Sequence, residues 1–191
     1  MSERGRLVVI SGPSGAGKTS ICRELLRRSA SELERVVTAT TRAPRGRERD
    51  GVDYLFLDRD EFDERIRDRR FLEHADVYGH LYGTPREQVE EGIARGSTLL
   101  LNIDVQGARQ LRDAGIDGLM TIFIEPPSFE ALEERLRGRG TDPQEVVRRR
   151  LEQAREEMGE KSKYDHVVVN DELERAAAEV VQLIDCSTGV M

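Results

Sequence analysis

The feature that most constrains this chain is a glycine-rich segment, GPSGAGKT, that directly follows the apolar run Leu7–Ile10. Its spacing is that of a phosphate-binding loop, or P-loop, which connects a strand to a helix. The glycines let backbone N–H groups converge on one point, and the following helix adds the positive end of its dipole. The residues expected to bind the phosphates of a nucleoside triphosphate are Gly12, Pro13, Ser14, Gly15, Ala16, Gly17, Lys18 and Thr19.

The last two residues of this loop are expected to carry its chemistry. Lys18 is expected to reach the β- and γ-phosphates as a catalytic cation, and the Thr19 hydroxyl is expected to ligate Mg²⁺ with waters and ATP phosphates. Lysine is rare in this chain, at positions 18, 161 and 163, so a chance match to the motif is improbable. The motif therefore favours nucleotide binding over a glycine-rich turn that only caps a helix.

Apolar runs of strand length alternate with helix-like stretches along most of the chain. Strands are expected at 7–10, 36–40, 54–57, 71–75, 81–82, 98–103, 119–124 and 166–170. Helices are expected over 18–28, 141–158 and 173–184, after Asp104, and after N-cap signals at Asp58, Thr84 and Ser128. This order predicts an α/β fold, the three-layer fold of P-loop NTPases, with a parallel sheet between helices. The segments 38–88 and 128–163 break the alternation and are expected to be insertions.

Composition narrows the classes of partner. The net charge of −7 argues against a general nucleic-acid surface, and the apolar runs are too short to span a bilayer. The first residues, MSER, do not begin a signal peptide. Cys22 and Cys186 lack metal-ligand spacing, which favours buried free thiols and a reducing cytosol. We therefore expect a cytoplasmic protein that binds small molecules, neither nucleic acid nor membrane, with an oligomeric state that the sequence leaves open.

Four arginines fall within eight residues, at positions 42, 45, 47 and 49. Charge runs are usually solvated faces, but Pro44 stiffens this loop and hydroxyl-bearing side chains flank it. The planar guanidinium group also suits bidentate contacts with phosphate. An anion site is therefore favoured for Arg42 and Arg45, whereas Arg47 and Arg49 are expected on the surface.

A second arginine-rich stretch lies at 135–155. Glutamates interleaved with these arginines account for several of them as ion pairs one helical turn apart. Glycines on both sides of Arg139 would let it move, an arrangement typical of a lid that brings arginines onto transferring phosphates. Arg135, Arg139 and Arg150 are expected to act in this way, and the other arginines are expected on the surface.

Two carboxylates stand out by their position. Asp104 follows a buried strand, where it could hold Mg²⁺ through water, bind a second substrate or cap the next helix. Glu73 lies in the largely apolar stretch 71–77, and a buried carboxylate needs a donor partner. Guanine offers such a partner with its N1–H and amino group, and an arginine salt bridge is an equally good interpretation.

These motifs together resemble the guanylate kinase family over about residues 6–185. The resemblance rests on VVISGPSGAGKT (8–19), TATTRAPRGRERDGVDY (38–54), YGHLYGT (78–84), NIDVQGA (102–108), RLRGRGTD (135–142) and VVNDEL (168–173). It implies transfer of the γ-phosphoryl group of ATP to GMP, and to dGMP, with Mg²⁺. It also implies a P-loop core at 1–37, 89–127 and 164–191, a GMP-binding subdomain at 38–88 and a helical lid at 128–163.

The resemblance further implies roles for individual residues. The expected GMP-binding residues are Thr38, Arg42, Arg45, Glu48, Tyr54, Glu73, Tyr82, Thr84 and Asp104. Within this set, Glu48 would orient the arginines and Glu73 would accept from the guanine edge. The expected contacts of ATP beyond the P-loop are Arg135, Arg139 and Asn170. The expected catalytic residues are Lys18, Arg45, Arg135, Arg139 and Arg150. Asn102 stands where the family often has an acidic residue.

Two other functions compete with this interpretation. A ribose-bisphosphate kinase of related fold would keep the P-loop but have little use for Glu73 and Thr84 facing a purine. A non-catalytic guanylate-kinase-like module that binds phosphopeptides would typically have a damaged P-loop, and Lys18 and Thr19 are intact here.

Overall fold

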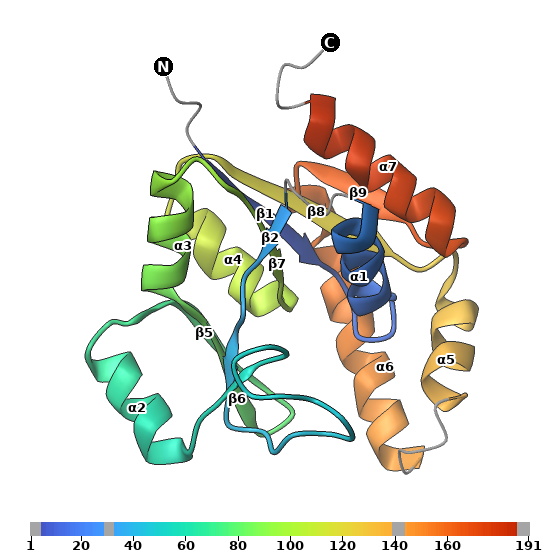
Figure 1. Cartoon of the computed structure of the whole chain (residues 1–191). Helices are drawn as coiled ribbons and strands as arrows, with labels where there is room; N and C mark the ends of the chain where they lie inside the picture. The colour runs from blue at the N-terminus through green and yellow to red at the C-terminus, as the bar shows by residue number, and fades with distance from the viewer. Residues whose placement is uncertain (1–4, 29–32, 139–143, 187–191) are drawn as a thin grey trace.

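A parallel sheet forms the centre of the molecule (Figure 1). The computed structural model describes residues 5–28, 33–138 and 144–186. Within these residues the central sheet has five strands in the order β2-β7-β1-β8-β9. Their bounds are Arg6–Ser11 for β1, Leu33–Arg35 for β2, Thr98–Asn102 for β7, Leu119–Glu125 for β8 and His166–Val169 for β9. The predicted α/β fold with a parallel sheet is confirmed.

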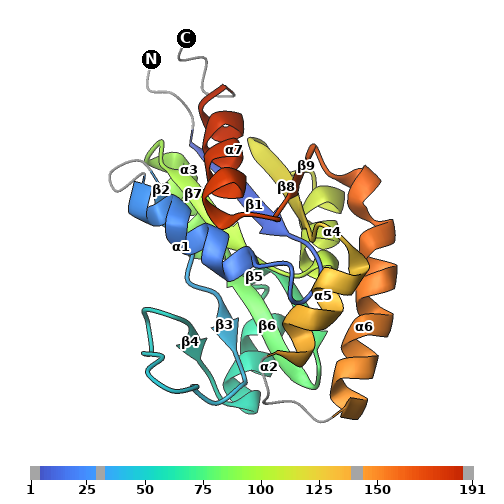
Figure 2. The same ribbon diagram turned by 90° about the vertical axis from the view of Figure 1, so that its right-hand side faces the viewer.

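Helices cover both faces of this sheet, as Figures 1 and 2 show. Because successive strand residues point to opposite faces, Val8 of β1 packs in the core under α1 and α7, whereas Leu7 packs under α3 and α4. The helices are α1 (Lys18–Arg28), α3 (Arg86–Ala94), α4 (Val105–Asp113) and α7 (Leu173–Cys186). Apolar residues on both faces of β1 therefore specify a sheet buried between two helical layers.

A second, mixed sheet lies apart from the first and has the order β4-β3-β6-β5 within the described residues. Its strands are β3 (Ala39–Thr40), β4 (Leu55–Phe56), β5 (Phe71–Val77) and β6 (His80–Pro85). The helix α2 (Arg59–Arg67) covers it and places Phe62 against Phe71 in a small core. The predicted capping box is confirmed, because the Asp58 side chain accepts from the Glu61 N–H and the Glu61 side chain accepts from the Asp58 N–H.

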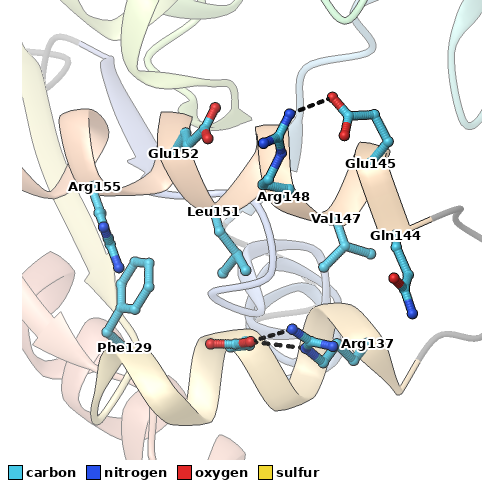
Figure 3. Close-up of a pocket in the computed structure, with 10 residues that line it drawn as sticks. Phe129, Arg137, Gln144, Glu145, Val147, Arg148, Leu151, Glu152 and Arg155 are labelled. Carbon is cyan, nitrogen blue, oxygen red and sulfur yellow. Dashed lines mark hydrogen bonds and ion pairs between the residues drawn. The ribbon is translucent and has the colours of Figure 1, made fainter.

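Two further helices, α5 (Phe129–Arg137) and α6 (Gln144–Gly159), pack against each other and are followed by a 3-10 turn, η1 (Lys161–Lys163). Ser128 caps α5 as predicted. A groove of about 710 Å³ lies between the two helices, and Figure 3 shows the side chains that line it. Ion pairs of Arg137 with Glu133 and of Arg148 with Glu145 confirm that interleaved charges account for several of these arginines.

Three local predictions are wrong. The expected strand over 36–40 is divided, because the chain leaves the central sheet after Val36 and enters the second sheet at Ala39. Thr84 does not cap α3, since it lies in β6 and its hydroxyl donates to Glu73 instead. Cys22 is buried as predicted, but Cys186 is exposed because it ends α7 beyond the core.

Across the part of the chain that the structure describes, no helix has the length and apolar character that a membrane span requires.

Candidate functional site

The loop between β1 and α1 has the backbone conformation that its glycines predict. Gly12, Gly15 and Gly17 have φ angles of 136°, 93° and 93°, a region that L side chains rarely adopt. A Cβ atom at Gly12 would also collide with the Ile124 carbonyl oxygen. The Lys18 ammonium group donates to the carbonyl oxygens of Gly12 at 2.6 Å and Pro13 at 3.0 Å. The glycines thus shape the loop, and Lys18 folds back along its rim.

A cavity of about 200 Å³, here called the inner cavity, opens beside this loop. The P-loop, the ends of β7 and β5, and one face of α6 line it together. Its lining residues include Gly12, Ser14, Lys18, Thr19, Glu73, Asn102, Asp104, Gln153 and Glu157. The structure thus brings Glu73 and Asp104, predicted to contact one substrate, into the same cavity as Lys18, predicted to contact the other.

An adjoining cavity of about 400 Å³, here called the arginine cavity, lies on the side of the second sheet. Arg42, Arg45 and Glu48 line it. The two cavities share five wall residues, namely Thr19, Thr38, Tyr54, Tyr82 and Asn102. Most of the predicted site residues therefore surround one continuous region, whereas none of those that the structure describes lines the larger groove between α5 and α6.

Arg42 is the most constrained cation of the arginine cavity. Its guanidinium group is only 6% exposed and forms a bidentate pair with Glu48, with N–O distances of 2.9 and 3.0 Å. Its Nε donates to the Tyr82 hydroxyl at 3.2 Å. Burial alone would lower the pKa of Arg42, but the hydrogen bonds to Glu48 and Tyr82 outweigh burial and raise this pKa. Glu48 also accepts from the backbone N–H of Arg45 at 2.7 Å, so one carboxylate holds the Arg42 side chain and the backbone at Arg45.

Glu73 lies on β5 and is only 3% exposed. The Thr84 hydroxyl, on the neighbouring strand β6, donates to its Oε1 at 2.5 Å. Burial raises the pKa of Glu73 to about 7, and the Asp104 carboxylate adds to this rise while Thr84 opposes it. Among the described residues no arginine or lysine forms an ion pair with Glu73, so the salt-bridge interpretation is wrong.

Asp104 caps the N-terminus of α4, where its Oδ1 accepts from the Gly107 N–H at 2.9 Å. Its second oxygen accepts from the Gln106 amide at 3.0 Å. A side chain at Gly107 would collide with the Glu73 carboxyl, so this glycine lets the two carboxylates share one cavity wall. Asp104 therefore caps a helix and faces the inner cavity at the same time.

The residues predicted to contact ATP beyond the P-loop fall in two places. Asn170 donates to the Ala16 carbonyl oxygen at 2.7 Å, and Arg135 donates to the Asn170 carbonyl oxygen at 2.9 Å, so both lie against the P-loop. Arg150 lies on α6, with its guanidinium carbon 5.1 Å from the centre of the Tyr78 ring. Arg139 lies outside the described residues.

Sequence reasoning missed Glu157, which α6 presents to the inner cavity. Its side chain is 8% exposed, its Oε1 accepts from Gln153 at 2.8 Å, and its Oε2 is buried without a hydrogen-bond partner. Burial raises the pKa of Glu157, and the nearby Lys18 ammonium group opposes this rise. A signal was present in the sequence, because Arg150, Gln153 and Glu157 are spaced so as to share one helix face.

A parallel sheet with a P-loop at the end of β1, beside two cavities rich in cations and carboxylates, defines a P-loop nucleotide-binding protein of the phosphotransferase kind. The sequence model of the guanylate kinase family matches residues 4–187. A guanylate kinase from Carboxydothermus hydrogenoformans is 48% identical over 93% of this chain and 86% of its own length. A guanylate kinase from Rubrobacter xylanophilus is 47% identical over 95% and 94%. The chain belongs to the guanylate kinase family.

A solved guanylate kinase structure agrees with this assignment. The crystal structure of guanylate kinase from Anaplasma phagocytophilum superposes with a TM-score of 0.79 at 32% identity, covering 97% of this chain and 87% of that one. A sugar kinase from a Janibacter species superposes with a TM-score of 0.54 at 16% identity, covering 95% of both chains. At that identity the second likeness is one of fold alone.

Proposed function

We propose that the inner cavity and the arginine cavity together hold the two nucleotides of the family's reaction, in which the γ-phosphoryl group of ATP passes to GMP. A member of the guanylate kinase family is an ATP:GMP phosphotransferase. The assignment of each nucleotide to particular residues is the part that we infer. It is supported by a P-loop on one side of the shared walls and by Arg42 and Arg45 on the other.

The GMP phosphate is assigned to the arginine cavity. Arg42 and Arg45 supply the positive charge, and the hydroxyls of Tyr54 and Tyr82 supply donors in the same wall. Because Glu48 already orders the Arg42 side chain, little freedom of that side chain remains to be lost when phosphate binds, and Glu48 also fixes the backbone at Arg45. Buried Arg42 can exchange part of its contact with Glu48 for phosphate oxygens without leaving its position.

Guanine is assigned to the part of the inner cavity near Glu73. An ionised Glu73 would accept from the N1–H and the amino group of guanine, a paired donor edge that adenine lacks. Thr38 and Thr84 offer hydroxyls beside it, and Asp104 closes the wall toward α4. Among the described residues Glu73 has no cationic partner. Its buried carboxylate is therefore stabilised by the donors of guanine when this base binds.

The ATP phosphates are assigned to the P-loop. Backbone N–H groups and Lys18 would bind the β- and γ-phosphates, with Arg135 and Asn170 at the adjoining edge. Arg150 approaches from α6, and Arg139 is proposed by motif alone. The acceptor phosphate is already ionised at neutral pH, so catalysis rests on in-line positioning and on cations that stabilise the transferring group rather than on a general base.

Mg²⁺ is the metal that we propose, and the donors present fit it. The Thr19 hydroxyl and the Asp104 carboxylate line the same cavity. Mg²⁺ keeps several waters and is commonly bound by one or two protein oxygens together with substrate phosphates. Such a site does not require a cluster of three or more His, Cys, Asp or Glu side chains, and the described residues contain no such cluster. When bound, the ion would neutralise charge on the β- and γ-phosphates. Asn102 lies beside Thr19 and adds no charge to this set.

We also propose that the chain is divided into a core and two inserted segments with separate functions. The core comprises 1–37, 89–127 and 164–191, the GMP-binding subdomain comprises 38–88, and the lid comprises 128–163. The division is supported by separate small cores, one under the second sheet and one between α5 and α6. Approach of the two insertions to the core would exclude water that otherwise hydrolyses ATP.

The observation that carries the choice of GMP is a buried carboxyl, Glu73, in the same cavity as the P-loop lysine. The experiment that tests it measures ADP formation from Mg-ATP with GMP, dGMP, AMP, CMP, UMP and ribose 1,5-bisphosphate offered separately. We expect strong preference for GMP, with dGMP accepted because the proposed guanine and phosphate contacts do not involve the ribose. Activity with the sugar phosphate alone would overturn the guanine site, and binding of GMP without transfer to any acceptor would favour a binding module.

A further inference from the structure

Tyr78 lies at the tip of the hairpin between β5 and β6, and none of the roles described above involves it. Its φ angle is +55°, an uncommon value for a residue with a side chain. Gly79 follows with a φ of +83°, and its N–H donates to Asp76 at 2.7 Å. This tight turn fixes the direction in which the Tyr78 side chain leaves the hairpin, toward the inner cavity that the side chain lines.

Three parts of the molecule meet around this side chain. The Arg150 guanidinium carbon of α6 lies 5.1 Å from the centre of the Tyr78 ring. Burial and the Glu157 carboxylate of α6 raise the pKa of the Tyr78 hydroxyl, whereas Arg150 and the P-loop residue Ser14 lower it. Tyr78 of the second sheet is therefore next to both α6 and the P-loop, although it is far from both in sequence.

The contact sets Arg150 against Tyr78, a residue that lines the inner cavity, although Arg150 is not itself among the lining residues. An arginine side chain has many rotamers, and ordering it during a reaction costs conformational entropy. The face of an aromatic ring attracts a guanidinium group and restricts it to a plane above the ring. A tyrosine at this point can thus keep the cation of α6 beside the P-loop before the nucleotides bind.

We propose that Tyr78 is a positioning residue for phosphoryl transfer, whose ring holds the Arg150 guanidinium group beside the P-loop. This inference rests on the proposed role of Arg150 toward the ATP phosphates. It adds that the GMP-binding subdomain supplies the side chain that places an arginine of the lid. The ring, and not the hydroxyl, makes the contact that matters.

The same helix offers a matched control. Arg155 of α6 lies over the Phe129 ring with its guanidinium carbon 4.7 Å from the ring centre, in the groove between α5 and α6 that Figure 3 shows. Arg155 and Arg150 thus share a helix and a type of contact. Arg155 lines the groove that holds none of the described site residues, whereas Arg150 lies over a ring that lines the inner cavity.

The test is a double-mutant cycle on the full chain, with kcat and the KM values of ATP and GMP measured for Y78A, R150A and Y78A/R150A. We expect Y78A to lower kcat about three- to tenfold, the range that a partly desolvated cation–π contact corresponds to. In the R150A background, adding Y78A should lower kcat by less than about twofold. Y78F should keep most of the kcat, and R155A should leave it unchanged.

Three outcomes would overturn the proposal. If Y78A lowers kcat as strongly in the R150A background as in the parent chain, Tyr78 does not act through Arg150. If Y78F loses as much as Y78A, the hydroxyl and not the ring is responsible. If R150A leaves kcat unchanged, the proposed role of Arg150 fails together with that of Tyr78. The kcat of the R150A variant by itself distinguishes this outcome from a failure of Tyr78 alone. Because Tyr78 is 41% exposed, its variants are expected to fold, and Y78F retains the packing of the ring.

Discussion

The P-loop and the arginine cavity are both suited to phosphate, but the chain builds them in opposite ways. The P-loop uses backbone N–H groups of consecutive residues, shaped by three glycines with positive φ. The arginine cavity uses side chains that the second sheet gathers, since the pairing of Thr40 with Tyr82 across β3 and β6 brings Arg42 next to the Tyr82 hydroxyl. A backbone site is encoded by local spacing, whereas a side-chain site depends on tertiary structure.

The two regions also differ in how their positive charge is held. Lys18 binds two carbonyl oxygens of its own loop, and carboxylates of other elements face the same cavity. Arg42 is instead fixed by a bidentate carboxylate, Glu48, within its own loop. Lys18 carries its charge at the end of a flexible side chain beside the P-loop, whereas Arg42, locked by a carboxylate, is suited to holding a phosphate that stays in place. This difference supports the proposal that the first region acts in phosphoryl transfer and the second holds the acceptor.

The largest effect should come from removing the cation of the P-loop. Lys18→Ala is expected to lower kcat by about 10²- to 10³-fold, the cost of losing one electrostatic contact to the transferring group. Its effect on GMP binding should be small because the arginine cavity is intact. Steady-state kinetics measures kcat, and calorimetric titration with GMP measures the affinity for GMP. An unchanged kcat would mean that Lys18 has no role in phosphoryl transfer.

The next largest effect should separate the two nucleotides. Glu73→Gln is expected to weaken GMP by about 10- to 100-fold, because the amide replaces one acceptor of the guanine edge with a donor. The affinity for ATP should stay within about twofold. Equal losses for both nucleotides would mean that Glu73 supports the structure of the cavity rather than recognising guanine.

A pH dependence follows from the same carboxyl group. With a pKa of about 7 in the free protein, Glu73 is mostly protonated at pH 6 and mostly ionised at pH 8. In the proposed guanine site the ionised form of Glu73 binds GMP, so the affinity for GMP should rise about tenfold over this interval. The GMP phosphate also titrates and adds its own pH dependence to the affinity. E73Q should keep this contribution of the phosphate and lose the contribution of Glu73. Identical slopes in both proteins would contradict this assignment.

The same carboxyl group should make the folded protein less stable as the pH rises, whereas the affinity for GMP increases. The pKa of Glu73 is raised from its usual 4.5 to about 7, so the folded protein binds the proton more tightly than the unfolded chain. The stabilisation that this carboxyl contributes is complete below about pH 4.5 and is lost as the pH rises toward 7. Denaturant unfolding of the parent chain and of E73Q between pH 5 and 8 measures the difference.

The sequence predicted most of the fold and the P-loop because those features depend on neighbouring residues. Apolar runs, helix caps and glycine spacing are local signals; the strand over 36–40, the cap at Thr84 and the burial of Cys186 failed. Thr84 failed because its hydroxyl has a stronger partner, Glu73, that is adjacent only across the β5–β6 pairing. Glu157 and Tyr78 were missed for the same reason. The helical spacing of Glu157 was a local signal, but that this face of α6 meets the hairpin at the inner cavity depends on tertiary structure.

The smallest effect is expected from an arginine that lies just outside the arginine cavity. Arg47 is exposed and does not line that cavity, although it belongs to the same arginine-rich loop as Arg42. Arg47→Ala is expected to change the KM of GMP by less than about twofold, since an exposed charge is screened by water and salt. A tenfold increase would extend the acceptor site beyond the cavity.

The most direct test of the account is a crossed pair of binding titrations, in which ATP and GMP are each titrated into K18A and R42K by calorimetry. R42K keeps the charge but cannot form the bidentate pair with Glu48 together with the contact to Tyr82. We predict that K18A weakens ATP and leaves GMP nearly unchanged, while R42K weakens GMP and leaves ATP nearly unchanged. If both variants weaken the same nucleotide, the two regions do not serve separate phosphates and the account is wrong.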